Sequence, residues 1–178
     1  DAVDYKNLGA LVCGVDEVGR GCLAGPVYAA AVILRPDYKL SGLTDSKLMS
    51  AEKRTKIAEV IKNESLCFAI ETASVEEIDE LNILWASMLA MRRAIEKLSI
   101  KPEHVLVDGH QKIPQFSNKF PSPFSVEQST LVKGDLRCLP ISAASVLAKV
   151  ARDQVMEELS EEFPVYDFVG HKGYPTSS

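Results

Sequence analysis

Four acidic residues stand at places in the sequence where a carboxylate could do chemistry. The apolar stretch 11–15 runs into the adjacent pair Asp16 and Glu17, and a second apolar stretch runs into Asp108. Asp135 follows a third, strand-like stretch. In an open α/β sheet the functional crevice lies outside the strand ends, so these carboxylates can meet at one edge. There they would repel one another unless they shared protons or a cation.

Hard divalent cations explain such a cluster best. Carboxylate oxygens without Cys or His favour Mg²⁺ or Mn²⁺ over Zn²⁺. Two such ions can hold a phosphate, activate a water and stabilise the departing oxygen of an in-line displacement. The alternative is that each acid only ends a strand and faces solvent, as most single charged residues do. The convergence of four acids favours the metal site.

A glycine-rich segment directly follows the first acidic pair. Gly19, Arg20 and Gly21 could bring backbone N–H groups and a guanidinium close to phosphate or hydroxyl oxygens. A tight turn that needs positive backbone angles explains the glycines equally well. The segment does not match a dinucleotide-binding fingerprint, because Pro26 and the β-branched run after it predict a strand where that fingerprint requires a helix.

Two further segments carry residues that suit contact with nucleic acid. Lys47 stands in a polar loop, and Tyr174 lies in a His-Lys-Gly-Tyr-Pro-Thr segment close to the end of the sequence. A lysine can neutralise a backbone phosphate, and an exposed tyrosine can stack on a sugar or base. Taken singly, each is more often a solvated surface residue.

Alternating strands and helices must position these residues. Apolar or alternating runs predict strands over residues 11–15, 27–34, 66–73, 104–109 and within 124–132. Apolar residues at steps of three and four predict helices over residues 51–62, 83–98 and about 140–162. Ser74 and Glu77 fit the capping box of one more short helix. This order indicates an α/β domain with a mixed sheet rather than a helix bundle or a sandwich.

The two longer helices are each predicted to bury one side. In the first helix the buried side carries Leu84, Met88, Met91, Ile95 and Leu98. In the second it carries Ile141, Ala144, Leu147, Ala151, Val155 and Leu159. Another side of the second helix carries Ser142, Ser145 and Lys149, which lack a His partner for a hydrolase triad. Capping and packing explain these three residues equally well.

The composition is that of one ordinary soluble globular domain. The chain has 178 residues, of which 46% are hydrophobic and 25% charged. Its net charge of -5, taken alone, argues against a polyanionic partner. Its apolar runs are too short for a membrane-spanning helix, and it begins without a secretion signal. Four scattered cysteines without a Cys-x-x-Cys pair favour reduced thiols in a cytosolic protein.

Six segments stand in an order that is typical of one enzyme family. They cover residues 14–21, 45–47, 106–109, 133–135, 141–153 and 171–176. Together they closely resemble bacterial ribonuclease HII, the type 2 ribonuclease H, from about residue 11 to 176. The resemblance implies a ribonuclease H-like α/β fold with a mixed central sheet flanked by helices. It also implies metal-dependent endonucleolytic cleavage of RNA in RNA–DNA hybrids and at single ribonucleotides in duplex DNA, leaving 3′-hydroxyl and 5′-phosphate ends.

The resemblance also implies roles for individual residues. The metal ligands would be Asp16, Glu17, Asp108 and Asp135, with Mg²⁺ or Mn²⁺ as cofactor and two ions during catalysis. The loop that reads the ribose 2′-hydroxyl, the group that separates RNA from DNA, would be Gly19, Arg20 and Gly21. Lys47 would contact a backbone phosphate, and Tyr174 would stack near the RNA-to-DNA junction.

The sequence departs from the family in two places. The segment 110–130 is longer than is usual for bacterial members, so Asp153 competes with Asp135 as the fourth carboxylate. Similar proteins continue beyond the last motif, so residues 1–178 are expected to form a single catalytic domain with a C-terminal segment shortened after about residue 176. We expect a cytoplasmic monomer that binds RNA–DNA hybrid and ribonucleotide-containing DNA but no membrane; a replication-clamp partner cannot be inferred.

Two other functions remain as alternatives. A binding module would recognise nucleic acid through Arg20, Lys47 and Tyr174 without cutting it and without needing the carboxylates. A dinucleotide-dependent oxidoreductase would bind its cofactor at residues 19–25, where the following strand is unfavourable. The net charge does not decide against a nuclease, because two divalent cations at one site add four positive charges and change -5 to -1.

Overall fold

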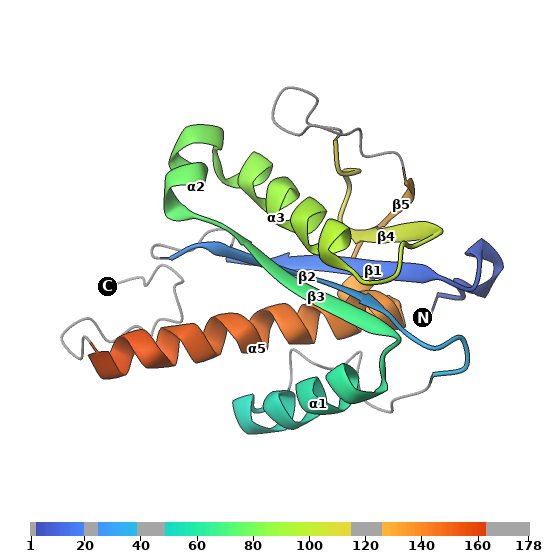
Figure 1. Cartoon of the computed structure of the whole chain (residues 1–178), viewed down its shortest axis with the longest axis horizontal. Coiled ribbons are helices and arrows are strands. Elements are labelled where there is room, and N and C mark those ends of the chain that lie inside the picture. Colours follow the sequence, from blue (N-terminus) through green and yellow to red (C-terminus); the bar gives the residue numbers. More distant parts are fainter. Residues whose placement is uncertain (1–2, 20–24, 39–48, 115–125, 163–178) are drawn as a thin grey trace.

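The computed structural model describes residues 3–19, 25–38, 49–114 and 126–162 (Figure 1). Its strands are β1 (Val12–Val18), β2 (Val27–Ile33), β3 (Cys67–Ala73), β4 (His104–Asp108) and β5 (Glu127–Leu131). Its α-helices are α1 (Ala51–Glu64), α2 (Val75–Leu81), α3 (Ile83–Lys97), α4 (Gly134–Arg137) and α5 (Leu139–Glu162). A short 3₁₀ helix, Lys6–Leu8, precedes β1.

The strands form a mixed sheet in the order β3-β2-β1-β4-β5. The pairs β1–β2 and β2–β3 are antiparallel, whereas β1–β4 and β4–β5 are parallel. The predicted mixed α/β sheet is therefore confirmed. Because β1, β4 and β5 run in the same direction, their carboxyl ends meet at one edge of the sheet.

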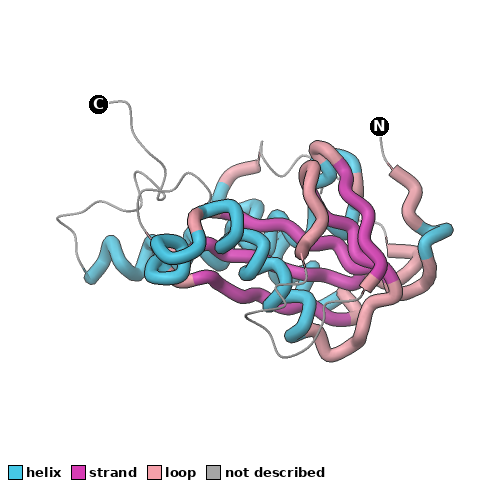
Figure 2. Tube along the Cα trace, turned by 90° about the horizontal axis from the view of Figure 1, so that it is seen from above, coloured by secondary structure: helices cyan, strands magenta, loops and turns pink. Residues whose placement is uncertain are grey.

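Helices cover both faces of the sheet (Figures 1 and 2). One face, which carries Val15, Ala31 and Val105, packs on α3. The opposite face, with Ala30 and Val32, packs on α1 and α5. Successive side chains of a strand point to opposite faces, so β2 and β3 contribute to both cores. The methionines of α3 lie in the first core, as the sequence predicts. No helix in the described part of the chain has both the length and the apolar character to span a membrane.

The amino end of α5 is seated directly on β1. A Cβ built on Gly14 would lie 2.2 Å from the carbonyl carbon of Pro140 and 2.4 Å from the backbone nitrogen of Ile141. Real Cβ atoms essentially never approach a neighbour so closely. Glycine at position 14 is thus what allows the helix backbone to touch the central strand.

Local capping explains where the other helices begin. Ser74 accepts a hydrogen bond from the backbone N–H of Glu77, whose carboxylate accepts one from the N–H of Ser74. This is the predicted capping box. Asn82, at a φ of 74°, separates α2 from α3 and accepts a hydrogen bond from the N–H of Trp85. A positive φ is uncommon for a residue other than glycine, and Asn is among the residues that adopt one most often.

The connection between β4 and β5 is fastened at its base. Ile113 is buried, and its backbone N–H donates to Oε1 of Gln128 at 2.7 Å. Nε2 of Gln128 donates in return to the carbonyl oxygen of Ile113 at 3.0 Å. One side chain of β5 therefore holds the chain shortly after β4 by two hydrogen bonds.

Two predicted element boundaries are wrong. β1 does not end before the acidic pair but continues through Asp16 and Glu17 to Val18. Asp135 does not end a strand, because residues 134–137 form α4 after Lys133 takes a left-handed conformation (φ 57°, ψ 35°). Residues other than Gly, Asn and Asp rarely take that conformation, so the lysine gives no sequence signal for the turn.

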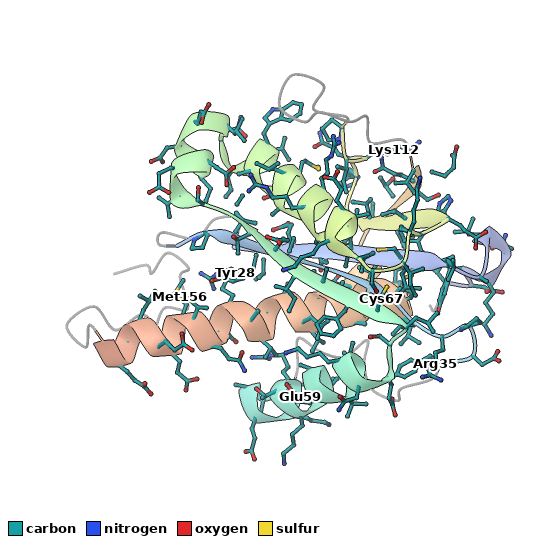
Figure 3. All side chains as sticks on the ribbon, in the orientation of Figure 1. Tyr28, Arg35, Glu59, Cys67, Lys112 and Met156 are labelled. Atoms are coloured by element: carbon teal, nitrogen blue, oxygen red, sulfur yellow. The ribbon has the colours of Figure 1, made fainter. Side chains whose placement is uncertain are left out.

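The buried side of α5 is also only partly as predicted. It is confirmed for Ile141, Ala144 and Leu147. The remaining predicted residues, Ala151, Val155 and Leu159, are only half-buried. Here the buried side carries Arg152 and Met156, and Met156 lies on the side of α5 toward the sheet (Figure 3). A Cβ on Gly25 would lie 2.8 Å from Cε of Met156, so this side packs against the turn before β2. A hydropathy pattern cannot place a buried arginine.

Candidate active site

Three aspartates from three elements meet at the edge of the sheet where the parallel strands end. Asp16 lies near the end of β1, Asp108 is the last residue of β4, and Asp135 lies in the first turn of α4. One carboxylate oxygen from each lies within 4.8 Å of the others. Asp16 and Asp135 are buried, and Asp108 is half-buried. The structure thus brings together three of the four predicted acids.

Strand pairing explains why Asp16 and Asp108 lie together. β1 and β4 are adjacent and parallel, with Val15 paired to Val107. Both valines belong to the core on the α3 side. The residue after each valine therefore points to the α5 side, so the two aspartates lie on the same face of adjacent strands.

The first residues of α4 supply hydrogen bonds to Asp108. The backbone N–H of Gly134 donates to Oδ1 of Asp108 at 2.7 Å. A Cβ on Gly134 would lie 3.2 Å from that same oxygen and 2.5 Å from Cδ1 of Ile141. A residue without a side chain allows this close approach. In the sequence, the glycine directly before Asp135 is the visible sign of this contact. Only the folded backbone shows that Gly134 brings its N–H to Asp108.

Burial and mutual repulsion act on the titration of the site. Burial raises the pKa of Asp16 well above its usual range, and the nearby charges of Asp108 and Glu17 raise it further. The pKa of Asp108 is also raised, first by burial and then by Asp135, while the backbone N–H groups of Gly134 and Asp135 oppose the shift. The site therefore holds negative charge at a cost to the folded chain, which a bound cation would relieve.

Glu17 does not join the three aspartates. Alternation along β1 places its half-buried side chain on the α3 side, opposite to Asp16. Its backbone N–H donates to Oδ1 of Asp16 at 2.8 Å, so its main chain supports the site. A ligand role for the Glu17 carboxylate stays a prediction.

The competing acid, Asp153, lies elsewhere on α5. Its Oδ2 is 3.9 Å from Nη2 of Arg54, across the contact between α5 and α1. It is not a member of the group of three carboxylates. Of the two candidates for the fourth acid, the fold brings Asp135 to Asp16 and Asp108.

The glycine-rich segment begins as a buried turn. Gly19 has a φ of 113°, and a Cβ there would lie 3.2 Å from the carbonyl oxygen of Pro26 and 3.3 Å from Cα of Val27. β2 then starts at Val27, so the helix that a dinucleotide fingerprint requires is replaced by a strand. The other predicted substrate contacts, Arg20, Gly21, Lys47 and Tyr174, lie outside the described residues.

The sequence alone does not decide the role of one buried polar residue, Ser142. Oγ of Ser142 donates to the backbone carbonyl oxygen of Asp135 at 2.7 Å, and Ser142 is fully buried. Its place near the start of a helix is equally typical of a capping or packing serine. The contact with Asp135 depends on how α4 folds back onto α5, which no local pattern indicates.

The donor set suits a hard divalent cation. The three neighbouring groups are all carboxylates, which Mg²⁺ and Mn²⁺ prefer, and two of them are buried. Backbone N–H groups orient two of the carboxylates: that of Glu17 donates to Asp16, and that of Gly134 donates to Asp108. These residues therefore fit the cofactor that the sequence predicts.

Comparison with solved structures supports the fold. The ribonuclease H2 of Pyrococcus horikoshii OT3 superposes with a TM-score of 0.77 at 25% identity, over 93% of this chain and 81% of that one. Bst-RNase HIII in complex with Mn²⁺ superposes with a TM-score of 0.71 at 21% identity, over 87% and 56% of the two chains. The RNase HII of Archaeoglobus fulgidus, solved as a complex with PCNA, gives a TM-score of 0.70 at 28% identity, over 94% and 83%. The domain thus has a ribonuclease H-like fold.

Comparison of sequences is more specific. The ribonuclease HII of Bacteroides thetaiotaomicron is 49% identical over 172 residues, which cover 97% of this chain and 82% of the relative. That of Acidovorax sp. (strain JS42) is 52% identical over 176 residues, covering 99% and 79%. The family model for ribonuclease HII matches residues 13–178. With three aspartates converging at the sheet edge and relatives about half identical along nearly its whole length, this chain belongs to the ribonuclease HII family of endoribonucleases.

Proposed function

We propose that this enzyme hydrolyses the RNA strand of RNA–DNA hybrids and incises duplex DNA at single ribonucleotides, with two divalent cations at the carboxylate cluster. Membership of the family supports metal-dependent ribonuclease H activity. The observation that carries the assignment of the site is the convergence of Asp16, Asp108 and Asp135 within 4.8 Å. The proposed products end in a 3′-hydroxyl and a 5′-phosphate.

The carboxylates would act by holding and orienting the cations. Asp16, Asp108 and Asp135 would be the ligands, and Glu17 would complete the set from the neighbouring position on β1. Divalent cations at such a site polarise the phosphate, lower the pKa of an attacking water and stabilise the leaving oxygen. The Mn²⁺ complex of the structurally similar Bst-RNase HIII supports the choice of metal. The N–H groups of Glu17 and Gly134 keep two of the carboxylates in place.

Substrate recognition would use the segment that starts at Gly19. This residue lies three positions after Asp16, so backbone groups of Gly19, Arg20 and Gly21 would be near the reacting phosphate and could bind a ribose 2′-hydroxyl. Lys47 would contact a phosphate, and Tyr174 would stack near the RNA-to-DNA junction. The duplex is the proposed partner of a single catalytic domain that works as a monomer.

A cleavage assay with three labelled duplexes tests this function. The substrates are an RNA–DNA hybrid, a DNA duplex with one ribonucleotide and an all-DNA duplex, each with Mg²⁺, Mn²⁺ or EDTA. We expect incision of the first two only, and only with metal. Asp16→Asn should lower the rate by about 100-fold or more, since loss of a residue that merely orients a metal ligand already costs about 10-fold to 100-fold. Asp153→Asn, which lies outside the cluster, is the matched control and should retain cleavage.

Two results would contradict the proposal. The first is a wild-type chain that cuts no ribonucleotide-containing duplex with either metal. The second is an Asp16→Asn variant that cuts as fast as wild type. If Asp153→Asn rather than Asp135→Asn abolished cleavage, the fourth carboxylate would be misassigned while the function stood.

A further inference from the structure

We infer that Ser142 is a positioning residue that holds Asp135 in the metal site. The inference rests on the proposed function, because it concerns a proposed ligand. Ser142 lies in the first turn of α5 and is fully buried. Its hydroxyl oxygen is 2.7 Å from the carbonyl oxygen of Asp135 and 3.0 Å from that of Cys138.

Asp135 needs an anchor because α4 is only four residues long. Backbone hydrogen bonds at the two ends of this helix run from the Cys138 N–H to the Gly134 carbonyl at 2.8 Å and from the Leu136 N–H to the Lys133 carbonyl at 3.0 Å. Carbonyl groups in the last turn of a helix have no partner within it. A buried carbonyl without a partner is unfavourable. The hydroxyl of Ser142 supplies one to Asp135 from a neighbouring helix.

The hydroxyl proton has two acceptors in reach but serves one at a time. The Cys138 carbonyl already accepts the backbone N–H of Ser142 at 2.8 Å. The Asp135 carbonyl is also the closer of the two to Oγ. The hydroxyl of Ser142 is therefore better placed to donate its hydrogen bond to the backbone carbonyl of Asp135. A serine with a purely local role looks like Ser87 of α3, which is fully buried and donates to the carbonyl of Ile83 at 2.8 Å.

One hydrogen bond to this short helix affects two ligands. Fixing the backbone of Asp135 fixes the origin of its own carboxylate. It also fixes the N–H groups of Gly134 and Asp135, which hydrogen-bond to the carboxylate of Asp108. Ser142 thereby orients Asp135 directly and Asp108 through α4.

The other end of this link is rigid. Ser142 follows the segment of α5 that touches β1, where Pro140 and Ile141 lie against Gly14. Asp16 stands two residues after Gly14 on the same strand. Ser142 thus connects α4 to the part of α5 that packs against the strand of Asp16. Through this connection the positions of all three aspartates depend on the same contact between α5 and β1.

Mn²⁺ affinity distinguishes this role from ordinary packing. Binding can be followed by the EPR signal of free Mn²⁺ during titration of the wild-type chain and of Ser142→Ala, Ser142→Cys and Ser87→Ala, with melting temperatures taken in EDTA. Cysteine has the same branching as serine but is a weak donor, so it serves as the test if the alanine variant does not fold. Ser87→Ala removes a buried serine that donates to the carbonyl four residues earlier, on α3, which covers the face of the sheet opposite to α5.

We expect Ser142→Ala and Ser142→Cys to bind Mn²⁺ about 10-fold more weakly than wild type, at the lower end of the range for residues that orient metal ligands. Ser87→Ala should lower the melting temperature similarly and leave the Mn²⁺ affinity unchanged. Wild-type Mn²⁺ affinity in a folded Ser142 variant would overturn the inference and leave the proposed function standing. A wild-type chain that binds no Mn²⁺ would overturn both.

Discussion

Asp16 and Asp108 face one another because the valines before them, Val15 and Val107, are paired across parallel strands. The register of two strands therefore determines the distance between two carboxylates. Both pKa values are raised, chiefly by burial. Four consequences of this site and of its supporting structure can be measured.

The first prediction concerns pH and metal at Asp16. An acid whose pKa is raised by folding stabilises the fold below its unfolded pKa of about 4, and this contribution is lost as the pH rises through the raised folded value. In EDTA, Asp16→Asn should therefore melt at a higher temperature than wild type, and the difference should grow from acidic to neutral pH. Thermal unfolding across this pH range measures it.

Mn²⁺ should reverse that order. A ligand that binds only the folded chain at 100 times its Kd adds about 2.7 kcal/mol of stability. Wild type should gain a higher melting temperature from Mn²⁺, while Asp16→Asn gains little. An equal gain in both chains would place the bound ion away from Asp16.

The second prediction concerns the contact between β1 and α5. Gly14→Ala would place a methyl group against backbone atoms of Pro140 and Ile141, which cannot give way as a flexible side chain would. We expect a loss of about 3 kcal/mol in the free energy of unfolding, measured with urea. Gly109→Ala is the comparison, since its added Cβ meets nothing within 4 Å and only its φ of 109° is strained. It should cost about 1–2 kcal/mol. Equal losses would mean that α5 can move away from β1.

The third prediction concerns the turn at Gly19. An alanine there keeps the strained φ of 113° and approaches the backbone of Pro26 and Val27. Gly19→Ala should lower the free energy of unfolding by about 1–3 kcal/mol and also slow incision at a single ribonucleotide. Urea unfolding measures the stability, and the incision rate is measured at a temperature where the variant is folded. Full cleavage by the folded variant would rule out a role of this turn in reading the 2′-hydroxyl.

The fourth prediction concerns the ion pair between α2 and α3. Arg93 donates to both carboxylate oxygens of Glu77, at 2.7 and 2.6 Å, and these bonds lower the pKa of Glu77 to about 2. The stabilisation is present above the unfolded pKa of about 4.3 and is lost as the pH falls toward 2. Glu77→Gln keeps a capping residue but removes the charge, so it should cost about 1 kcal/mol at pH 7. The cost should vanish near pH 2.

Glu76→Gln is the matched control, because Glu76 is the exposed acid next to Glu77 in the same helical turn. It should change the stability at pH 7 much less than Glu77→Gln. Equal effects would attribute the result to charge at the start of α2 rather than to Arg93.

Much of the frame was predictable because it depends on local patterns. Apolar or alternating runs predicted the strands. The Ser74 capping box predicted α2, and the apolar side that includes Met88 predicted α3 within a few residues of its observed bounds. The meeting of Asp16 with Asp108 was predictable as well, since parallel strand ends share one edge.

The rest depends on contacts between distant segments. Lys133 takes a left-handed conformation that its residue type does not announce, so α4 was missed. Burial of Arg152 contradicts any hydropathy pattern. The ligand role of Glu17 stays a prediction: its neighbour Asp16 is in the cluster, but alternation along β1 places the Glu17 side chain on the opposite face of the sheet.

The two hydrogen bonds between Gln128 and the backbone of Ile113 have a consequence for how this chain can vary. They hold Ile113 against β5 before the chain reaches α4. The distance between Asp108 and Asp135 therefore does not depend on the number of residues between positions 113 and 128. Doubling the length of a chain segment between two fixed ends costs only about 0.6 kcal/mol. An insertion between positions 113 and 128 should therefore leave the carboxylates in their places.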